Sequence, residues 1–180
     1  MIRWSLWILS GLVLGGLVHL ATILVLPRTA SRDAYARLAS LVPVNGFTVL
    51  PGPNPEESVL PFMDPAFAVA VCRYDLAKGP VKLTVPVNQA YTSVTFYTRR
   101  DIAYYAINDR AAGRRSIELD LMTTKQREAL PDDEDVTAAD RLIVESPSLT
   151  GLIVARALSP EPSLMPAATA ALQAAQCKPQ

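Results

Sequence analysis

The feature that most constrains this chain is an uncharged stretch of 23 residues near its N-terminus, from Trp4 to Leu26. As an α-helix it would be about 35 Å long, which exceeds the roughly 30 Å hydrocarbon core of a bilayer. Trp4 and Trp7 lie at one end of the stretch, where indole side chains favour the membrane interface. We therefore predict a single transmembrane anchor over residues 1–28.

A cleaved signal peptide is the alternative interpretation of this stretch. The hydrophobic core of a signal peptide is usually about 7–15 residues long, so the length of the run favours an uncleaved anchor. Thr29 and Ser31 would provide small residues for a cleavage after Ser31, and this alternative stays open.

One face of the predicted anchor carries Gly11, Gly15 and His19. Two glycines four residues apart allow helices to approach closely, and a histidine is costly when it faces lipid. This face therefore predicts helix pairing or self-association in the membrane. The alternative is that the glycines are ordinary for such a helix and that His19 reaches toward the interface.

Two features of the sequence indicate opposite orientations of the anchor: the charges that flank it and the pair of cysteines. Arg28, Arg32 and Arg37 follow the anchor and only Arg3 precedes it, so the positive-inside rule would place the C-terminal domain in the cytosol. However, long domains are translocated largely regardless of such a small bias.

Cys72 and Cys177 are the only cysteines of the chain and lie 105 positions apart. A disulfide between them would indicate an oxidising compartment and could stabilise the domain by about 4–5 kcal/mol. The spacing alone fits a disulfide and two unrelated buried thiols equally well. On orientation we follow the cysteines and predict a domain outside the cytosol.

The rest of the chain divides into a short connecting region and a β-rich domain. In residues 29–65, Ser31 to Leu41 has an amphipathic pattern that predicts a short helix capped by Ser31, and a proline-rich extended arm continues to Pro65. Residues 66–180 contain short apolar or alternating runs that predict strands. These runs are Ala66–Tyr74, Val81–Val87, Thr92–Thr98, Ile102–Ile107, Ser116–Met122, Arg141–Glu145 and Gly151–Leu158.

Two helices are expected within this β-rich domain. Thr123 and Gln126 form a capping-box pattern at the start of a short helix that runs to Leu130, and an alanine-rich helix is predicted over Pro162–Gln176. We therefore predict a mainly β fold, an antiparallel sandwich or a barrel-like domain, with an N-terminal transmembrane helix and a C-terminal helix.

Composition excludes several classes of function. Seventeen Lys and Arg residues balance 17 Asp and Glu residues, so no nucleic-acid partner is indicated. The only histidine, His19, lies in the anchor, which excludes Ser-His-Asp and Cys-His catalysis and imidazole zinc sites in the domain. The glycine-rich patterns of dinucleotide-binding and phosphate-binding loops, GxGxxG and GxxxxGK[ST], do not occur in the sequence. We predict no catalytic residue, no metal and no cofactor, and we favour a non-enzymatic role while leaving an enzyme open.

Four side chains are candidates for a ligand pocket. Tyr97 and Tyr105 could line one, although tyrosines on a sheet face usually serve packing. Arg156 lies on an otherwise apolar strand, and we expect a structural ion pair between it and Glu145 on the preceding strand. The acidic run Asp132–Asp135 is interpreted as a solvated loop rather than a calcium site, because it lacks the alternating Asp spacing and the glycine of a calcium-binding loop.

Three separated segments resemble a known family. They are PFMDPAFAVAVCRYDLAKGPVKLTVPV, YTRRDIAYYAINDR and GLIVARAL, the last followed by the final cysteine. Together with the anchor they resemble the short, membrane-anchored branch of the bacterial domain-of-unknown-function family twelve-fifty-four. The resemblance carries no catalytic motif.

The resemblance implies a partner, a location and a cysteine pairing. Larger members join this domain to a second uncharacterised β-rich domain, so a companion β-rich protein is the expected partner. The expected location is the bacterial inner membrane, with a single span and a periplasmic domain. Similar sequences carry cysteines at the positions of Cys72 and Cys177, which favours the disulfide.

Overall fold

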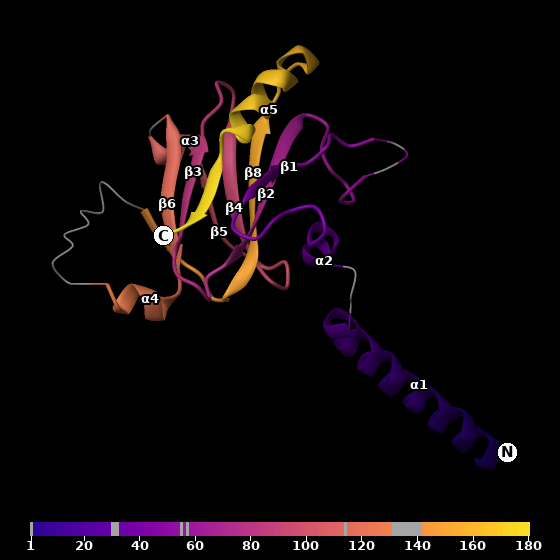
Figure 1. Ribbon diagram of the computed structural model, residues 1–180. Coiled ribbons are helices and arrows are strands. Elements are labelled where there is room, and N and C mark those ends of the chain that lie inside the picture. Colours follow the sequence, from indigo (N-terminus) through magenta and orange to yellow (C-terminus); the bar gives the residue numbers. More distant parts are fainter. Residues whose placement is uncertain (1, 30–32, 55, 57, 114, 131–141) are drawn as a thin grey trace. The chain divides into compact units, whose positions relative to one another are not determined.

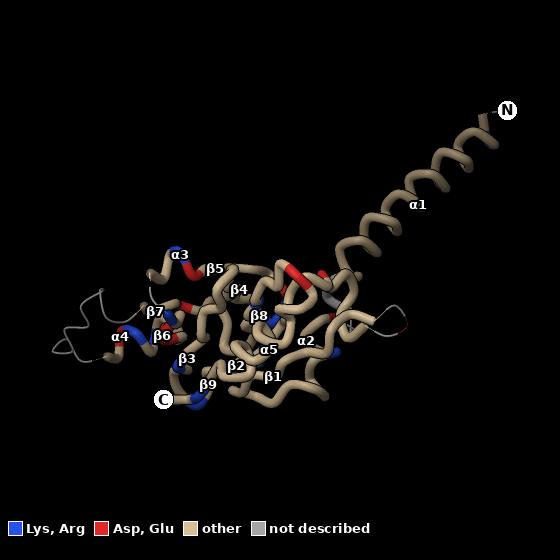
Figure 2. Tube along the Cα trace, turned by 90° about the horizontal axis from the view of Figure 1, so that it is seen from above, with Lys and Arg blue, Asp and Glu red and all other residues tan. Residues whose placement is uncertain are grey.

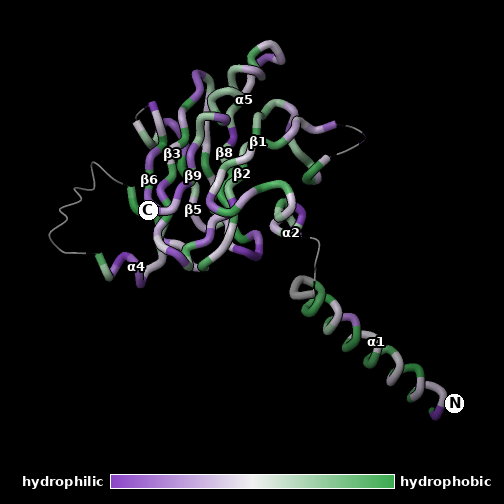
Figure 3. The backbone as a smooth tube through the Cα atoms, in the orientation of Figure 1, coloured by the Kyte–Doolittle hydropathy of each residue, from purple (hydrophilic) through white to green (hydrophobic). Residues whose placement is uncertain are grey.

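The computed structural model of the chain describes residues 2–29, 33–54, 56, 58–113, 115–130 and 142–180. It divides into two compact units, Met1–Asp33 and Ala34–Gln180. The first unit consists of helix α1 (Ile2–Thr29), drawn in indigo in Figure 1. Its segment Ile2–Leu26 is long and apolar enough to cross a membrane, and Figure 3 shows hydrophobic residues along most of its length.

The second unit is built around two β-sheets. Within the described residues, the first sheet has five antiparallel strands in the order β1-β2-β8-β4-β5 and the second has four in the order β7-β6-β3-β9. The first comprises β1 (Phe47–Val49), β2 (Phe67–Asp75), β8 (Thr150–Leu158), β4 (Thr92–Thr98) and β5 (Ala103–Asn108). The second comprises β7 (Leu142–Glu145), β6 (Ser116–Met122), β3 (Val81–Pro86) and β9 (Gln176–Pro179), and its β6–β7 pair is parallel.

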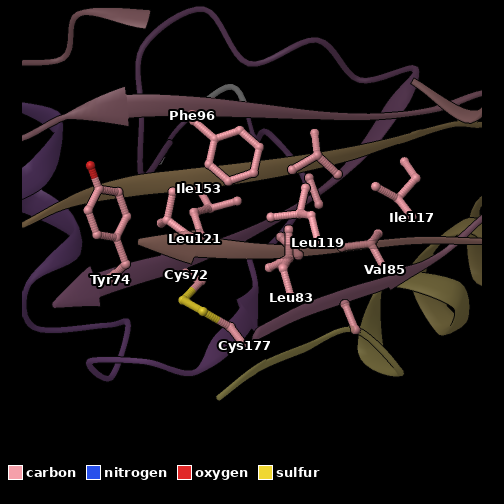
Figure 4. Close-up of a cluster of buried hydrophobic side chains, with 14 of the residues drawn as sticks. Cys72, Tyr74, Leu83, Val85, Phe96, Ile117, Leu119, Leu121, Ile153 and Cys177 are labelled. Carbon is pink, nitrogen blue, oxygen red and sulfur yellow. A yellow bond between two sulfur atoms is a disulfide. The ribbon is translucent and has the colours of Figure 1, made fainter. Parts of the chain in front are cut away.

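The two sheets share one apolar core. In β3 the buried side chains of Val81, Leu83 and Val85 alternate with exposed or half-buried ones, which is the period expected for a strand with one face inside. Figure 4 shows Phe96 and Ile153 of the five-stranded sheet gathered with Leu119 and Leu121 of the other sheet. The expected mainly β, sandwich-like fold with an N-terminal apolar helix and a C-terminal helix is therefore confirmed.

A disulfide links the two sheets. Cys72 of β2 bonds to Cys177 of β9, and both side chains are buried in the core (Figure 4). The bond ties the C-terminal strand to the opposite sheet, so the expected cysteine pair is confirmed.

Short helices connect or cover the strands. They are α2 (Ala34–Leu38), α3 (Asp109–Ala112), α4 (Thr124–Glu128), the 3-10 turn η1 (Pro162–Leu164) and α5 (Met165–Gln173). The capping box expected from Thr123 and Gln126 is present at the start of α4. The expected Ser31 cap of the first short helix lies outside the described residues.

The predicted end of the C-terminal helix is wrong. Helix α5 ends at Gln173, and the chain then forms strand β9, in which Gln176 pairs with Thr84 of β3. The alanine-rich composition favours helix through Gln176, but Cys177 is tied to Cys72 and its neighbours pair with β3. Tertiary contacts thus override local helix propensity here.

The region that precedes β2 folds onto the outer face of the five-stranded sheet. Strand β1, which the sequence did not predict, pairs with β2 at its edge. Helix α2 and the chain that follows it form a second, smaller apolar cluster against the outer face of β2 and β8. The buried members of this cluster are Leu38, Val42, Leu50, Val69, Val71 and Leu152.

Basic residues of the second unit occur in separate places, including α4 and the end of β9 (Figure 2). This distribution does not mark one charged face of the described residues as a binding surface.

Candidate functional site

Strand β8 directs a distinct set of side chains to the outer face of its sheet. Ile153 and Ala155 point into the sandwich core, whereas the alternating residues Leu152, Val154 and Arg156 face outward. The strand register places Ser93 of β4 and Val69 of β2 on either side of Arg156. It also places Tyr97 beside Leu152, four residues along the strand.

These outward residues lie in a groove of about 630 Å³, a volume within the usual range of small-molecule sites. Apolar side chains of the sheet form its floor, and helix α2 and the segment before β2 form its wall. The floor comprises Phe67, Val69, Leu152 and Val154. The wall comprises Ala34, Leu38, Leu60, Pro61, Phe62 and Met63.

Among the described residues, Arg156 is the only basic one that lines the groove, and its side chain is exposed. Its guanidinium makes no hydrogen bond or ion pair with any residue that the structure describes. Tyr91 and Ser93 of the same lining lie close to it in the strand register, because Ser93 is directly opposite Arg156. One end of the groove therefore offers a cation together with hydroxyl groups.

Two carboxylates also line the groove, and both belong to turns. The side chain of Asp64 accepts a hydrogen bond from the backbone N–H of Ala66, at 2.9 Å. Asp101 lies in the β4–β5 turn with a φ of 59°, and its N–H donates to the carbonyl of Thr98. Asp101 follows Tyr97 and so lies toward the end of the groove opposite Arg156.

Helix α2 is held in place by two arginines. The guanidinium carbons of Arg73 and Arg99 lie 5.2 Å and 4.1 Å from the ring centroid of Tyr35. Such contacts stabilise by about 0.5–1 kcal/mol each at exposed sites. They link α2 to β2 and to the β4–β5 turn, which fixes the groove wall relative to its floor.

At the rim of the groove, Phe62 is completely exposed and has a φ of 59°. A left-handed backbone is uncommon for an aromatic residue and costs on the order of 1 kcal/mol. The side chain extends the apolar wall of the groove toward solvent.

The structure brings together two of the four predicted pocket residues. Tyr97 and Arg156 both line the groove. Tyr105 faces the sandwich core instead, where its ring lies 5.7 Å from that of Phe96. Glu145 lies on β7 in the other sheet.

The expected ion pair between Glu145 and Arg156 is wrong. Glu145 pairs with Arg127 of α4 and accepts a hydrogen bond from Thr124 at 2.9 Å. These contacts, the one with Arg127 foremost, lower the pKa of Glu145 below its ordinary value. Arg156 needs no internal partner because it is exposed, whereas the apolar sequence around it had suggested burial.

A buried polar cluster that the sequence did not reveal surrounds the hydroxyl of Tyr74. This hydroxyl lies within hydrogen-bond distance of Ser146 (3.0 Å), Ser148 (3.2 Å) and the Tyr104 hydroxyl (3.3 Å). Burial raises the pKa of Tyr104 above its ordinary range, so its hydroxyl stays protonated. The cluster joins the β7–β8 connection to the five-stranded sheet and has a structural role.

No group of three or more His, Cys, Asp or Glu side chains that could hold a metal occurs in the part of the chain that the structure describes. The acidic run Asp132–Asp135 lies outside the described residues.

The groove wall around Leu60 and Met63 was also missed, because a proline-rich arm gives no sequence signal for where it folds back.

Comparison with known proteins gives a family and a fold. A family model described as "Protein of unknown function (DUF1254)" matches residues 44–179, which confirms the resemblance seen in the sequence. No curated protein matches the chain.

Two solved structures are similar to the chain, the first of them in fold. The VPA0106 protein from Vibrio parahaemolyticus is 14% identical with a TM-score of 0.60 over 81% of this chain and 34% of that one. An uncharacterised protein from Burkholderia cenocepacia is 11% identical with a TM-score of 0.47, over 76% of this chain and 34% of that one. The chain thus spans about a third of the length of either protein.

Proposed function

The chain belongs to the DUF1254 family of proteins of unknown function, and from this premise we propose that it is a non-enzymatic, membrane-anchored binding protein. Its β-rich domain would pack against a companion β-rich protein, and its N-terminal helix would hold the pair at the bacterial inner membrane. The observation that carries the proposal is an open sheet edge at β5.

Strand β5 is the longest edge strand of the described sheets. It has six residues and pairs only with β4, whereas the edge strands β1, β7 and β9 have three or four residues each. Ala103 and Ala106 of β5 are exposed, and Ile102 just before it is 62% exposed. An open edge with small and apolar side chains is a ready template for a strand from another protein.

The similarity to VPA0106 supports the same proposal. This fold accounts for about a third of that protein, so two thirds of its chain accompany the shared domain. In that protein the shared fold therefore accompanies further structure, and the proposal gives the present chain a companion protein of comparable kind.

The proposed location is the periplasmic side of the inner membrane. The buried Cys72–Cys177 disulfide supports an oxidising compartment, and α1 has the length and composition of a single span. Pairing of α1 through Gly11, Gly15 and His19 would bring two such anchors together. A reporter fused after Gln180 that is active only in the cytosol would contradict the periplasmic assignment.

Co-purification from detergent-solubilised membranes tests the companion. The double variant Ala103→Lys and Ala106→Lys places charges on the β5 edge, which should block strand addition. Ala170→Lys, at an exposed position of α5, is the matched control. We expect the wild type and the control to recover the same β-rich protein and the double variant to lose it. Recovery of no specific partner by the wild type, or equal recovery by all three, would refute the proposal.

The groove supports a second candidate function, the capture of a small ligand. It combines an apolar floor with the polar groups of Tyr97 and Arg156, which is the composition of many ligand sites. A hydrolytic version of this function would require a nucleophile beside a base, for which the described lining provides the Ser93 hydroxyl and the carboxylates of Asp64 and Asp101.

A further inference from the structure

The position of Arg156 is unusual among the outward residues of β8. Leu152 and Val154 precede it on the same face, and Val69 lies beside it on β2, so a charged group stands at the end of an apolar track. Among the described residues nothing neutralises its charge. An arginine in this setting suits an anionic group delivered by a ligand.

The apolar track has a defined length. From Arg156 to Leu152 the strand advances four residues, which is about 13 Å at 3.3 Å per residue. Leu38, Leu60 and Met63 face this track from the groove wall, and Phe62 extends the wall at the rim. An extended alkyl chain of about the length of a decanoyl group matches this distance.

We propose that the groove binds a free medium-chain carboxylic acid, with its carboxylate at Arg156 and its alkyl chain along Val154 and Leu152. This inference rests on the second candidate function above and assigns the ligand class. The hydroxyl groups of Ser93 and Tyr91 are placed to donate to the carboxylate at the same end.

The two acidic side chains of the groove lie at opposite ends of it. Asp64 lies toward the Arg156 end, because the carbonyl of the nearby Ala66 accepts a hydrogen bond from the N–H of Ser159, and its carboxylate accepts one from the N–H of Ala66. Asp101 lies toward the opposite end, beyond Tyr97. Arg156 is the only cation of the described lining, so it attracts a carboxylate to its end, where Asp64 opposes this attraction, while Asp101 repels a carboxylate from the other end. A neutral alkyl ligand would form no ion pair with Arg156.

Photolabelling of the full chain in phosphatidylcholine nanodiscs tests the inference. The probe is decanoic acid with a diazirine near its methyl end, and the matched probe is the corresponding alcohol. We expect the acid to label peptides around Leu60–Met63 or Leu152 at lower concentration than the alcohol, as determined by mass spectrometry.

Variants then assign the selectivity to one side chain. Arg156→Gln should raise the half-saturating acid concentration about tenfold, because it removes one charge-assisted interaction. Arg156→Lys should restore most of the loss, and Arg110→Gln, at an exposed position of α3, should have no effect. Val154→Trp should fill the track and abolish labelling by both probes.

Three results would overturn the inference, and they separate it from the proposed functions. Equal labelling by acid and alcohol, unchanged by Arg156→Gln, would refute the selection of a carboxylate by Arg156. The capture of a small ligand by the groove would remain supported. Absence of groove labelling by either probe would refute both the carboxylic-acid ligand and the capture of a small ligand. Loss of the companion protein by Val154→Trp, without any groove labelling in the wild type, would assign the groove to a protein segment.

Discussion

Reduction of the Cys72–Cys177 disulfide should greatly weaken the β-rich domain. The bond joins β2 of one sheet to β9 of the other, and both cysteines are buried. Reduction changes no side-chain volume appreciably, so it tests the cross-link itself rather than a cavity. Strand β9 would then be held by its pairing with β3 and by the contacts of Gln180 with Pro80 and Asp120.

The magnitude follows from the length of the closed loop. The two cysteines are 105 positions apart, and in the chain-entropy model a loop of about 100 residues corresponds to about 4.7 kcal/mol. Domains of this kind are stable by about 5–15 kcal/mol, so the loss is a third or more of the total. For a domain of about 150 residues it corresponds to a fall in Tm of roughly 10–20 °C.

The assay must report on the β-rich domain alone. The only tryptophans, Trp4 and Trp7, lie in α1, so tryptophan fluorescence would not follow unfolding of the sheets. Urea unfolding of the full chain, followed by far-UV circular dichroism at the strand signal, is suitable. Because the bond is buried, the protein is unfolded, reduced and refolded before the measurement.

The double variant Cys72→Ala and Cys177→Ala is the control, since reductant should not change its stability. If reduction lowers the unfolding free energy of the wild type by less than about 1 kcal/mol, the cross-link does not constrain the unfolded chain as argued. An equal response of the double variant to reductant would show that the effect lies elsewhere.

Three other changes have definite expected outcomes. Gly151→Ala would place a Cβ in steric clash with the backbone carbonyl oxygen of Tyr97 and 2.6 Å from Cζ of Tyr74, so urea unfolding should show a loss of about 1–3 kcal/mol. Arg127 lowers the pKa of Glu145 in the folded protein. The ionised carboxylate therefore stabilises the fold at pH values above the ordinary pKa of 4.5. This stabilisation is lost as the pH falls through the lowered pKa of the folded state. Any small advantage of the wild type over Glu145→Gln at neutral pH should therefore vanish in acid, and an advantage that persists there would contradict this. Gly15→Leu should reduce self-association of α1, measured by energy transfer between labelled chains in vesicles.

The strands were predictable where one face is buried and the other is not. The sequence predicted Thr92–Thr98 and Ser116–Met122 with the bounds that β4 and β6 have, because alternating burial leaves a period of two in the residues. Strands β1 and β9 left no such signal. They are three or four residues long, and β9 includes Lys178 and Pro179, so partners distant in the sequence define these strands.

The candidate site was only partly predictable, for a related reason. Strand β8 is apolar on both faces, because one face enters the core and the other lies under the arm that precedes β2. Such a strand resembles a fully buried one, and Arg156 was therefore expected to need an internal partner. No local rule indicates that the arm around Leu60 and Met63 folds back over β8 and turns this face into a groove.

The two apolar clusters of the domain make folding and binding separable. The disulfide and the largest buried side chains belong to the cluster between the sheets, whereas the groove is walled by residues of the smaller cluster on the outer face. Arg156 is exposed and Val154 half-buried on that outer face, so substitutions there leave the sandwich core intact. Arg156→Gln should therefore have the same free energy of unfolding as the wild type, within about 0.5 kcal/mol. A variant that loses both ligand labelling and stability would show that the outer cluster supports the whole fold.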